Sequence, residues 1–394
     1  MFTSGCSSAP EPVKVKVRLG IDNIDQQAAL FAGKRVGLIT NATGMNSNFE
    51  STVDVMKAKT NLVALFSPEH GIRGAVTAGD TVSSQTDAKT GLPIYSLYGD
   101  TKKPTPEMLA AVDVLAFDIQ DIGSRSYTYI YTMAYGMQAA KEAGKPFVVF
   151  DRPNPIGGVE VEGGLVKSGF ESFVGMYPIP YRHGMTVGEL AKLFNKEFGI
   201  DCNLVVVEMT GWKRGMYFDE TGLPWVMTSP NIPTPDTALL YPATGIFGGT
   251  NISEGVGTTR PFDFVGAAWL DAEALASRMN AKKLPGVVFR PAYYVPRFGN
   301  FSGENCAGVQ LHITDRKAFR PVRTGLTLLF TVQELGDDKF TFKDSGGRRP
   351  MIDLITGDSA LRLGRYNLDE LLAAWDAEAS QFKEMAKAYY IYPQ

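Results

Sequence analysis

Cysteine and histidine are both scarce in this chain of 394 residues, which contains three of each. Three widely spaced cysteines form neither a disulfide framework nor a zinc site. The histidines, His70, His183 and His312, show no HExxH or HxH spacing, so the sequence supports no metal site. We therefore expect a protein that works without a bound metal ion.

The chain also lacks an excess of positive charge and a long apolar run. Its 39 Lys and Arg residues against 42 Asp and Glu residues give a formal net charge of -3, which disfavours a nucleic acid as partner. No apolar stretch approaches the roughly 18 residues of a membrane-spanning helix. Apolar residues still make up 44% of the chain, so we expect a soluble globular body.

Motifs for nucleotides and for nucleophilic acyl transfer are missing too. No GxGxxG follows the first predicted strand, no GxSxG elbow occurs, and the glycine-rich stretch 248–262 lacks the lysine of a P-loop. We therefore expect no nucleotide binding and no acyl transfer by a serine or cysteine.

Short apolar runs alternate with amphipathic stretches between about residues 20 and 165. The runs are rich in β-branched and aromatic residues and end in polar or glycine-rich turns, which is typical of strands buried on both faces. Predicted strands are KRVGLIT, NLVALFS, LPIYSLYG, VDVLAFDI and KPFVVFD, and predicted helices lie at 24–32, 49–59, 105–111 and 131–143. The alternation predicts an α/β fold with a doubly wound parallel sheet.

The second half of the chain is less regular. Thr186 and Glu189 form a capping-box pattern that predicts a helix over 185–199. Residues 229–266 are dense in Pro, Gly, Asn and Thr without clear periodicity, and long segments of this kind usually carry function. Further strands are predicted at 201–209, 286–296 and 308–315, and helices at 324–334, 351–357 and 368–387. We expect a flexible tether over 1–19, a doubly wound domain over 20–168 and a smaller α/β domain over 169–394.

Polar residues gather where four of the predicted strands end. The segments are NATG after Thr40, SPEHGIRG after Phe66, DIQDIGSRSYTY after Phe117 and DRPNPIGG after Phe150. Ligands of open α/β sheets bind outside the carboxyl ends of the strands. We therefore expect these four ends to face one crevice.

Glu69 is the first candidate for catalysis, because it follows a proline at the end of a predicted buried strand. Desolvation at the lip of an apolar sheet favours the protonated form of a carboxyl group, as a general acid requires. The alternative is a surface glutamate paired with Arg73. His70 and Arg73 stand beside Glu69 as candidate substrate contacts.

Three aspartates follow two other predicted strands. Asp118 and Asp121 bracket DIQD, and Asp151 ends the next strand. Two carboxyl groups that flank the glycosidic bond are the minimum set of catalytic groups for glycoside hydrolysis. Acidic strand ends also bind divalent metals or cap the following helices, so these alternatives stay open.

Arg125 and Tyr127 lie in the aromatic stretch GSRSYTYIYT. An arginine can bind a ligand carboxylate through two hydrogen bonds, and a tyrosine can stack on a sugar or bond to its hydroxyls. The alternative is that these rings belong to the core of the next helix.

Cys6 is a candidate lipidation site. The stretch FTSGCSSAP places Ser-Gly before the cysteine and a Ser- and Pro-containing segment after it, as at the cleavage site of a bacterial lipoprotein signal, although an apolar h-region is missing. Acylation of Cys6 would anchor the protein to a membrane face; the alternative is a chance Gly-Cys pair in a flexible tail.

Longer strings resemble the exo-β-N-acetylmuramidase family over about residues 20–394. They include SPEHGIRG, YSLYG, FDIQDIGSRSYTYIYTM, DRPNPIGG, VEGGLV, YPIPYRHGMTVGELA, SPNIPTPDTALLYPATGIFGGTNISEGVGTTRPF and GVQLHITD. The resemblance implies a Rossmann-like catalytic domain, a smaller α/β domain and a cleft between them. It also implies a periplasmic or extracellular bacterial enzyme that removes N-acetylmuramic acid (MurNAc) from the non-reducing end of peptidoglycan fragments without a cofactor, with Glu69 as the catalytic residue.

This substrate suggests roles for the remaining candidate site residues. Asp118 or Asp121 is the second carboxylate, and Arg73, Arg125 or Arg152 binds the lactyl carboxylate. Candidate contacts for sugar hydroxyls or the acetamide are Tyr127, Asp151, Asn154, Glu162, Asn231, Thr250 and Asn251. Two other functions stay open: a non-catalytic lipoprotein that binds muropeptides, and a metal-dependent hydrolase that uses Asp118, Asp121 and His70.

Overall fold

The computed structural model describes residues 17–72 and 85–394, and its first sheet contains seven strands. They are β1 (Arg35–Thr40), β2 (Asn61–Ser67), β3 (Gln85–Thr86), β4 (Pro93–Ser96), β5 (Val114–Asp118), β6 (Phe147–Phe150) and β7 (Leu204–Val207). Their order is β3-β4-β2-β1-β5-β6-β7, and all neighbours are parallel except β3 and β4. The chain therefore reverses direction across the sheet between β1 and β5, which is the switch point at which doubly wound folds bind ligands.

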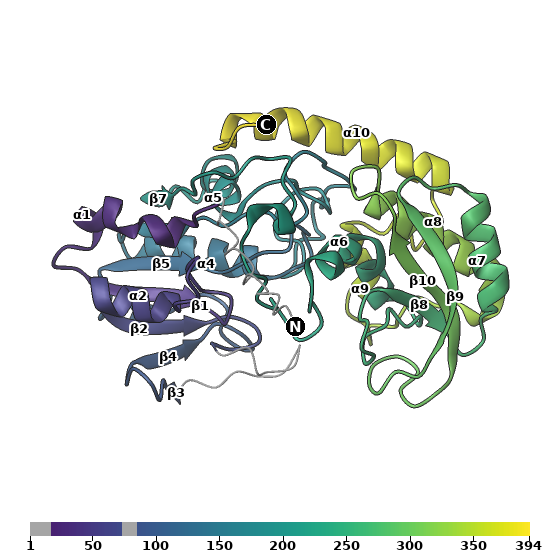
Figure 1. Cartoon of the computed structure of the whole chain (residues 1–394), viewed down its shortest axis with the longest axis horizontal. Coiled ribbons are helices and arrows are strands. Elements are labelled where there is room, and N and C mark those ends of the chain that lie inside the picture. Colours follow the sequence, from purple (N-terminus) through teal and green to yellow (C-terminus); the bar gives the residue numbers. More distant parts are fainter. Residues whose placement is uncertain (1–16, 73–84) are drawn as a thin grey trace, which may run out of the picture.

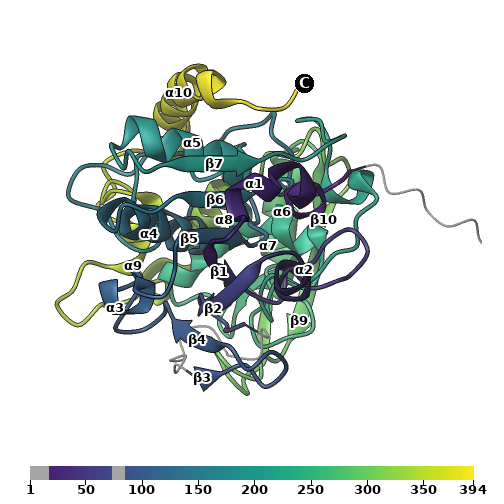
Figure 2. The same cartoon turned by 90° about the vertical axis from the view of Figure 1, so that its left-hand side faces the viewer.

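Helices cover both faces of this sheet because its strands are apolar on both sides. The elements are the 3₁₀-helix η1 (Gly20–Gln27), α1 (Ala28–Phe31), α2 (Thr52–Lys59), α3 (Pro106–Leu109), α4 (Tyr129–Glu142) and α5 (Val187–Glu197). Leu38 and Val148 belong to the core under η1, α1 and α2, whereas their neighbours Ile39 and Val149 belong to the core under α4 and α5. Figure 2 shows α2 and α4 on opposite sides of the strands.

The second unit contains a small antiparallel sheet of order β8-β10-β9. Its strands are β8 (Phe264–Ala267), β9 (Val287–Tyr294) and β10 (Cys306–Ile313). Its helices are α6 (Pro235–Thr244), α7 (Ala272–Ala281), α8 (Pro321–Gly336), α9 (Met351–Thr356) and α10 (Leu368–Ala386), with 3₁₀ turns η3 (Gly245–Gly249) and η4 (Asp337–Lys339). Two further 3₁₀ turns, η2 (Phe218–Thr221) and η5 (Lys387–Tyr389), pack against the first unit. None of the helices in the described parts of the chain is long and apolar enough to cross a membrane.

The C-terminal segment ties the two units together. Helix α10 runs from the second unit back over the first (Figure 1). The chain then reaches α5, where the Ile391 N–H donates to Glu189 Oε1 at 2.9 Å. The Tyr392 hydroxyl donates to Asp151 Oδ2 at 2.6 Å, and Pro393 O accepts from the Arg214 N–H at 3.0 Å. The last residues therefore complete the polar core of the first unit.

Most predicted elements are confirmed, and one region differs. All five predicted strands of the first half are present, and Thr186 and Glu189 form the predicted capping box of α5. The segment 229–266, which was expected to be irregular, contains helix α6 and strand β8, so this expectation was wrong. Helix α6 is buried nearly all round and carries Pro242 inside it, which removes the amphipathic periodicity that identifies a helix.

The two-unit division is visible, whereas the boundary near residue 168 stays a prediction. Strand β7 pairs with β6 in parallel, and α5 packs beneath the same sheet. The seven-stranded sheet therefore draws on residues well beyond 168.

Asp151 lies at the end of β6 as a fully buried carboxyl group with four hydrogen-bond donors. Its Oδ1 accepts from the Arg152 and Gly188 N–H groups, each at 2.8 Å. Its Oδ2 accepts from the Thr186 and Tyr392 hydroxyls at 2.8 and 2.6 Å. Burial raises the pKa of Asp151 to about 7, against the effect of these donors. These contacts agree with the helix-cap alternative, since Thr186 and Gly188 begin α5.

The raised pKa of Asp151 predicts a specific pH dependence of stability. The folded state binds the proton more tightly than the unfolded state, so the stabilisation is present below about pH 4 and is lost as the pH rises through about 7. Across this window, the free energy of unfolding of the wild type should fall by roughly 4 kcal/mol relative to that of Asp151→Asn. Urea unfolding of both proteins at several pH values measures the difference, and parallel stability curves would contradict it.

Candidate active site

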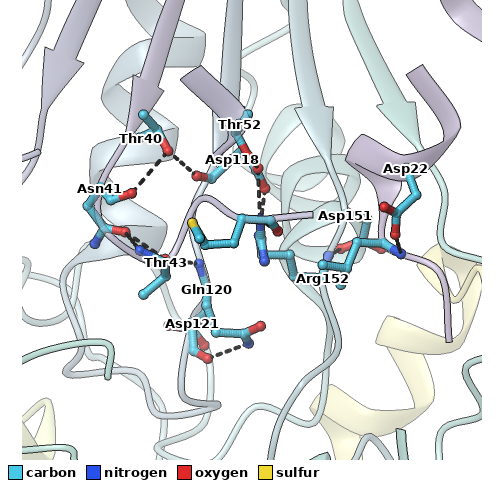
Figure 3. Close-up of polar contacts among 12 residues, drawn as sticks. Asp22, Thr40, Asn41, Thr43, Thr52, Asp118, Gln120, Asp121, Asp151 and Arg152 are labelled. Atoms are coloured by element: carbon cyan, nitrogen blue, oxygen red, sulfur yellow. Dashed lines mark hydrogen bonds and ion pairs between the residues drawn. The ribbon is translucent and has the colours of Figure 1, made fainter. Parts of the chain in front are cut away.

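The carboxyl ends of β1 and β5 are joined by a hydrogen-bond network at the switch point (Figure 3). Thr40 Oγ1 donates to Asp118 O at 2.8 Å. Asn41 Oδ1 accepts from the Thr43 N–H and hydroxyl at 2.9 and 2.6 Å, and Thr43 Oγ1 in turn accepts from the Gln120 N–H at 2.9 Å. The loops that follow two of the four polar strand ends therefore form one rigid platform.

Glu69 lies beside this platform, two residues after β2, and its side chain is half-buried. Thr128 Oγ1 donates to Glu69 Oε2 at 2.8 Å, and the Tyr98 hydroxyl also hydrogen-bonds to Glu69. Burial and the charge of Glu69 raise the pKa of Tyr98, so its hydroxyl stays protonated and acts as the donor. The next residue, His70, is buried and has a φ of 70°, a left-handed conformation that is costly outside glycine and is typical of functional sites.

Tyrosine rings form an apolar wall near Glu69. Tyr127 and Tyr129 meet edge to face at 5.0 Å, and Tyr127 and Tyr241 at 5.9 Å. The Tyr127 hydroxyl donates to Thr228 Oγ1 at 2.9 Å. Burial raises the pKa of Tyr127, and the charges of Glu69 and Asp121 raise it further. Tyr127 therefore lies within the electrostatic reach of two carboxyl groups, and residues of the second half of the chain complete the wall.

Asp118 and Arg152 are bound to each other. The guanidinium Nε and Nη2 of Arg152 lie 2.5 and 2.8 Å from the two carboxylate oxygens of Asp118. Arg152 Nη2 also donates to Met45 O at 2.8 Å, and Asp118 accepts from the Thr52 hydroxyl. Asp118 is fully buried and Arg152 nearly so. The structure thus places both predicted residues at the site but engages them in an internal ion pair.

Asp121 differs from Asp118 because one of its oxygens has no hydrogen-bond partner among the described residues. Asp121 is 4% exposed. Its Oδ2 accepts from the Gly123 N–H at 2.7 Å and lies 3.3 Å from His183 Nε2, whereas Oδ1 has no hydrogen-bond partner in the described structure. His183 Nδ1 accepts from the Met185 N–H at 3.2 Å, so the proton of the neutral ring lies on Nε2 and faces Asp121.

Three further residues that were predicted to contact the substrate form hydrogen bonds within the protein. Arg125 is fully buried and donates to Ile179 O at 2.8 Å and Ile355 O at 2.7 Å. Asn154 Nδ2 donates to Met185 O at 3.0 Å, and Asn154 Oδ1 accepts from Ile156 N–H at 3.1 Å. Glu162 pairs with Arg182 at 2.9 Å and accepts from the Val322 N–H at 3.2 Å. Each side chain links segments that are distant in sequence.

The remaining predicted residues lie in the second half of the chain or outside the described residues. Thr250 Oγ1 donates to Phe247 O at 2.8 Å, and Asn251 bonds to the backbone of Lys339 and Thr341. Asn231 is half-buried in the turn before α6. Arg73 and Cys6 lie outside the described residues. Within residues 17–72 and 85–394, no three His, Cys, Asp or Glu side chains form a group that could hold a metal ion.

Comparison with known proteins assigns the chain to a family. Two family models match, described as exo-β-N-acetylmuramidase NamZ, N-terminal, over residues 36–236, and exo-β-N-acetylmuramidase NamZ, C-terminal, over residues 239–392. The chain is 50% identical over 386 residues to the peptidoglycan β-N-acetylmuramidase NamZ of Bacillus subtilis strain 168, covering 96% of this chain and 92% of the relative. The chain belongs to the NamZ family.

Solved structures support the NamZ fold assignment. A crystal structure of a DUF1343 family protein from Bacteroides fragilis has a TM-score of 0.89 at 43% identity, covering 96% of this chain and all of that protein. A second DUF1343 structure from the same organism has a TM-score of 0.79 at 30% identity, covering 96% of this chain and 99% of that protein. The predicted family and α/β fold class are therefore confirmed.

The structure adds residues to the candidate site that sequence reasoning did not assign. Tyr98 and Thr128 bond to Glu69, Thr228 bonds to Tyr127, and His183 lies against Asp121. Tyr98 follows β4 by two residues, so the rule that strand ends carry polar groups could have identified it. Nothing local marks Thr128 or Thr228, because their roles depend on partners 59 and 101 residues away.

Proposed function

We propose that this chain is an exo-acting glycoside hydrolase that releases N-acetylmuramic acid from the non-reducing end of peptidoglycan fragments. Membership of the NamZ family and 50% identity to a named peptidoglycan β-N-acetylmuramidase support this function. The structural observation that carries the proposal is the half-buried carboxyl group of Glu69, held by two hydroxyl donors beside a wall of tyrosine rings.

Glu69 acts as the general acid in this proposal. Its proton passes to the glycosidic oxygen as the bond to the anomeric carbon breaks and an oxocarbenium-like transition state develops. The hydroxyls of Thr128 and Tyr98 orient the carboxyl group, since both donate to it. The apolar rings limit competition from water at the reacting centre.

A second carboxylate would assist water or stabilise the positive charge of the sugar. Asp118 and Asp121 both stay candidates for this role. Asp121 is favoured because its Oδ1 has no partner in the described structure, whereas both oxygens of Asp118 face Arg152. His183 holds Asp121 from the opposite side.

The lactyl carboxylate of the sugar requires a positively charged side chain as its partner, and three arginines were predicted for this role. Arg125 and Arg152 are buried and bonded to protein oxygens. Arg73 follows Glu69 by four residues and lies outside the described residues. We therefore favour Arg73 for this contact among the three.

We also propose that the protein works in the periplasm or outside the cell, anchored through an acylated Cys6. The support is the location of its proposed substrate and the Ser-Gly-Cys sequence before a Ser- and Pro-containing segment. Mass spectrometry of the protein from its native membrane tests the anchor. A diacylglyceryl mass on Cys6 would support it, and an unmodified cysteine in a soluble protein would contradict it.

The central test uses chromogenic N-acetylmuramide and N-acetylglucosaminide substrates, with and without EDTA. Hydrolysis of the muramide that survives EDTA supports the proposal. Binding of muropeptides without turnover would instead support a non-catalytic binding protein, and loss of activity in EDTA a metal-dependent hydrolase.

Thr128→Val should lower kcat for the muramide roughly ten-fold, because Glu69 then loses one of the two hydroxyls that orient its carboxyl group, and a hydrogen bond contributes about 0.5–1.5 kcal/mol. Thr132→Val is the matched control, since Thr132 lies on α4, whose N-cap residue is Thr128, and its hydroxyl has no partner in the described structure. Steady-state kinetics of both variants measures the effect. Equal kcat values for the two variants would show that Thr128 does not position Glu69.

A further inference from the structure

A groove outside the Glu69 site runs between η1 and α2, with a cavity volume of about 870 Å³. Figure 2 looks at the side of the molecule that carries α1 and α2. Met45 and Asn46 line this groove and also a smaller cavity that reaches Gln120 and Arg152 at the switch point. The groove therefore starts at the same edge of the sheet as Glu69.

Phe49 lines this groove and has an unusual exposure and backbone conformation. Its side chain is 58% exposed, and its φ is 64°. A bulky residue in the left-handed region is a genuine outlier, whereas Gly or Asn adopts this conformation at lower cost. Neither burial nor backbone geometry therefore accounts for an aromatic ring at this position, and strain of this kind is typical of ligand-binding sites.

Hydrogen bonds to and from Asn46 close the loop that carries Phe49. Asn46 Oδ1 accepts from the N–H groups of Asn48 and Glu50, each at 2.9 Å, and Asn46 Nδ2 donates to Glu50 Oε2 at 2.7 Å. The Phe49 N–H donates to Asn46 O at 3.1 Å. The ring is thus presented by a pre-organised loop, which lowers the entropic cost of binding a ligand.

The remaining lining of the groove mixes apolar side chains, among them Ile21, Ile24 and Val55, with polar ones whose charges nearly cancel. Three basic side chains face four carboxylates along it, and Lys59 pairs with Asp25 while Lys89 pairs with Asp54. Paired charges offer directional hydrogen bonds without a net field, which suits an uncharged polyhydroxylated ligand better than a polyanion. An exposed aromatic ring beside such groups offers an apolar surface for a sugar face.

We propose that this groove binds the glycan strand of the substrate at an uncharged N-acetylglucosamine unit, with the Phe49 ring stacked on that sugar. The choice of glycan rests on the proposed muramidase function, whereas the binding surface rests on Phe49 and its loop. A second contact of this kind would hold the enzyme on polymeric peptidoglycan while Glu69 acts on chain ends.

The test compares Phe49→Asn and Phe49→Trp with Tyr293→Ala, a control at a 70% exposed aromatic residue on β9 of the other sheet. We measure co-sedimentation of the full chain with peptidoglycan sacculi and with chitin, which carries the N-acetylated backbone without peptides. Phe49→Asn should weaken both affinities about ten-fold, the equivalent of roughly 1.4 kcal/mol, and should keep or raise Tm. Phe49→Trp should retain binding, and Tyr293→Ala should leave it unchanged.

Unchanged affinity of Phe49→Asn for sacculi, or a wild type that does not bind chitin, would overturn the inference. Co-sedimentation needs no turnover, so failure of the proposed function is detected separately. If the wild type does not cleave the muramide but still co-sediments in a way that depends on Phe49, the proposed hydrolase function is wrong and the glycan-binding groove is still supported.

Discussion

Glu69→Gln should reduce kcat for muramide hydrolysis by roughly a hundred- to ten-thousand-fold while leaving Tm within a few degrees of the wild type. The glutamine oxygen can still accept from the Thr128 hydroxyl, so this hydrogen bond survives. It cannot deliver a proton to the glycosidic oxygen, and general acid catalysis contributes roughly 10²–10⁴-fold. Steady-state kinetics with the chromogenic N-acetylmuramide, together with thermal unfolding, measures both quantities.

The matched control for this substitution is Glu142→Gln. Glu142 is an exposed glutamate at the C-terminal end of α4 that pairs with Lys103. It should leave kcat unchanged. A Glu69→Gln variant that keeps more than a tenth of the wild-type kcat would remove Glu69 from the role of general acid. The search would then turn to the other carboxyl groups of the strand ends.

Arg152→Met should destabilise the protein by about 3–5 kcal/mol, because it leaves the fully buried Asp118 carboxylate without its partner. Asp118→Asn should also be strongly destabilising, since the guanidinium then loses the charge it faces. The double variant Asp118→Leu with Arg152→Met should recover part of the loss, because neither charge remains buried alone. Urea unfolding measures all three free energies of unfolding.

An exposed pair at the opposite end of β5 from Asp118 provides the control for this ion pair. Arg35 begins β1, Asp113 precedes β5 by one residue, and their side chains lie 2.8 Å apart with both more than a third exposed. Arg35→Met should cost much less stability than Arg152→Met, because solvent screens an exposed ion pair. If Asp118→Asn instead unfolds like the wild type and loses activity, Asp118 is a catalytic residue and its pairing with Arg152 is secondary.

The carboxyl groups at these strand ends therefore differ in burial and in hydrogen bonding. Glu69 is the half-buried carboxyl group, whereas Asp118 and Asp151 are fully buried and meet donors on both oxygens. Asp121 is intermediate, because it is buried but has one oxygen without a partner in the described structure. All four were predicted from their positions after strands. Position alone did not distinguish them, because burial and partners depend on neighbouring strands.

The strands and helices with a strong local signal were predictable from the sequence. Strands β1, β2, β4, β5 and β6 appear where short apolar runs end in polar turns, and α5 begins at the capping box of Thr186 and Glu189. Helix α6 was missed because it is buried nearly all round and contains Pro242. Where the local pattern is weak, tertiary packing decides the secondary structure.

The sequence by itself determined the α/β class, the family and the choice of Glu69, because apolar runs, turn residues and long motifs are local properties of the chain. Only the tertiary structure decided that Arg152 binds Asp118 and that Thr128 holds Glu69. These partners lie 34 and 59 residues apart and meet only through the order of strands in the sheet. Contacts of this kind arise from the folded topology, so no local pattern in the sequence could predict them.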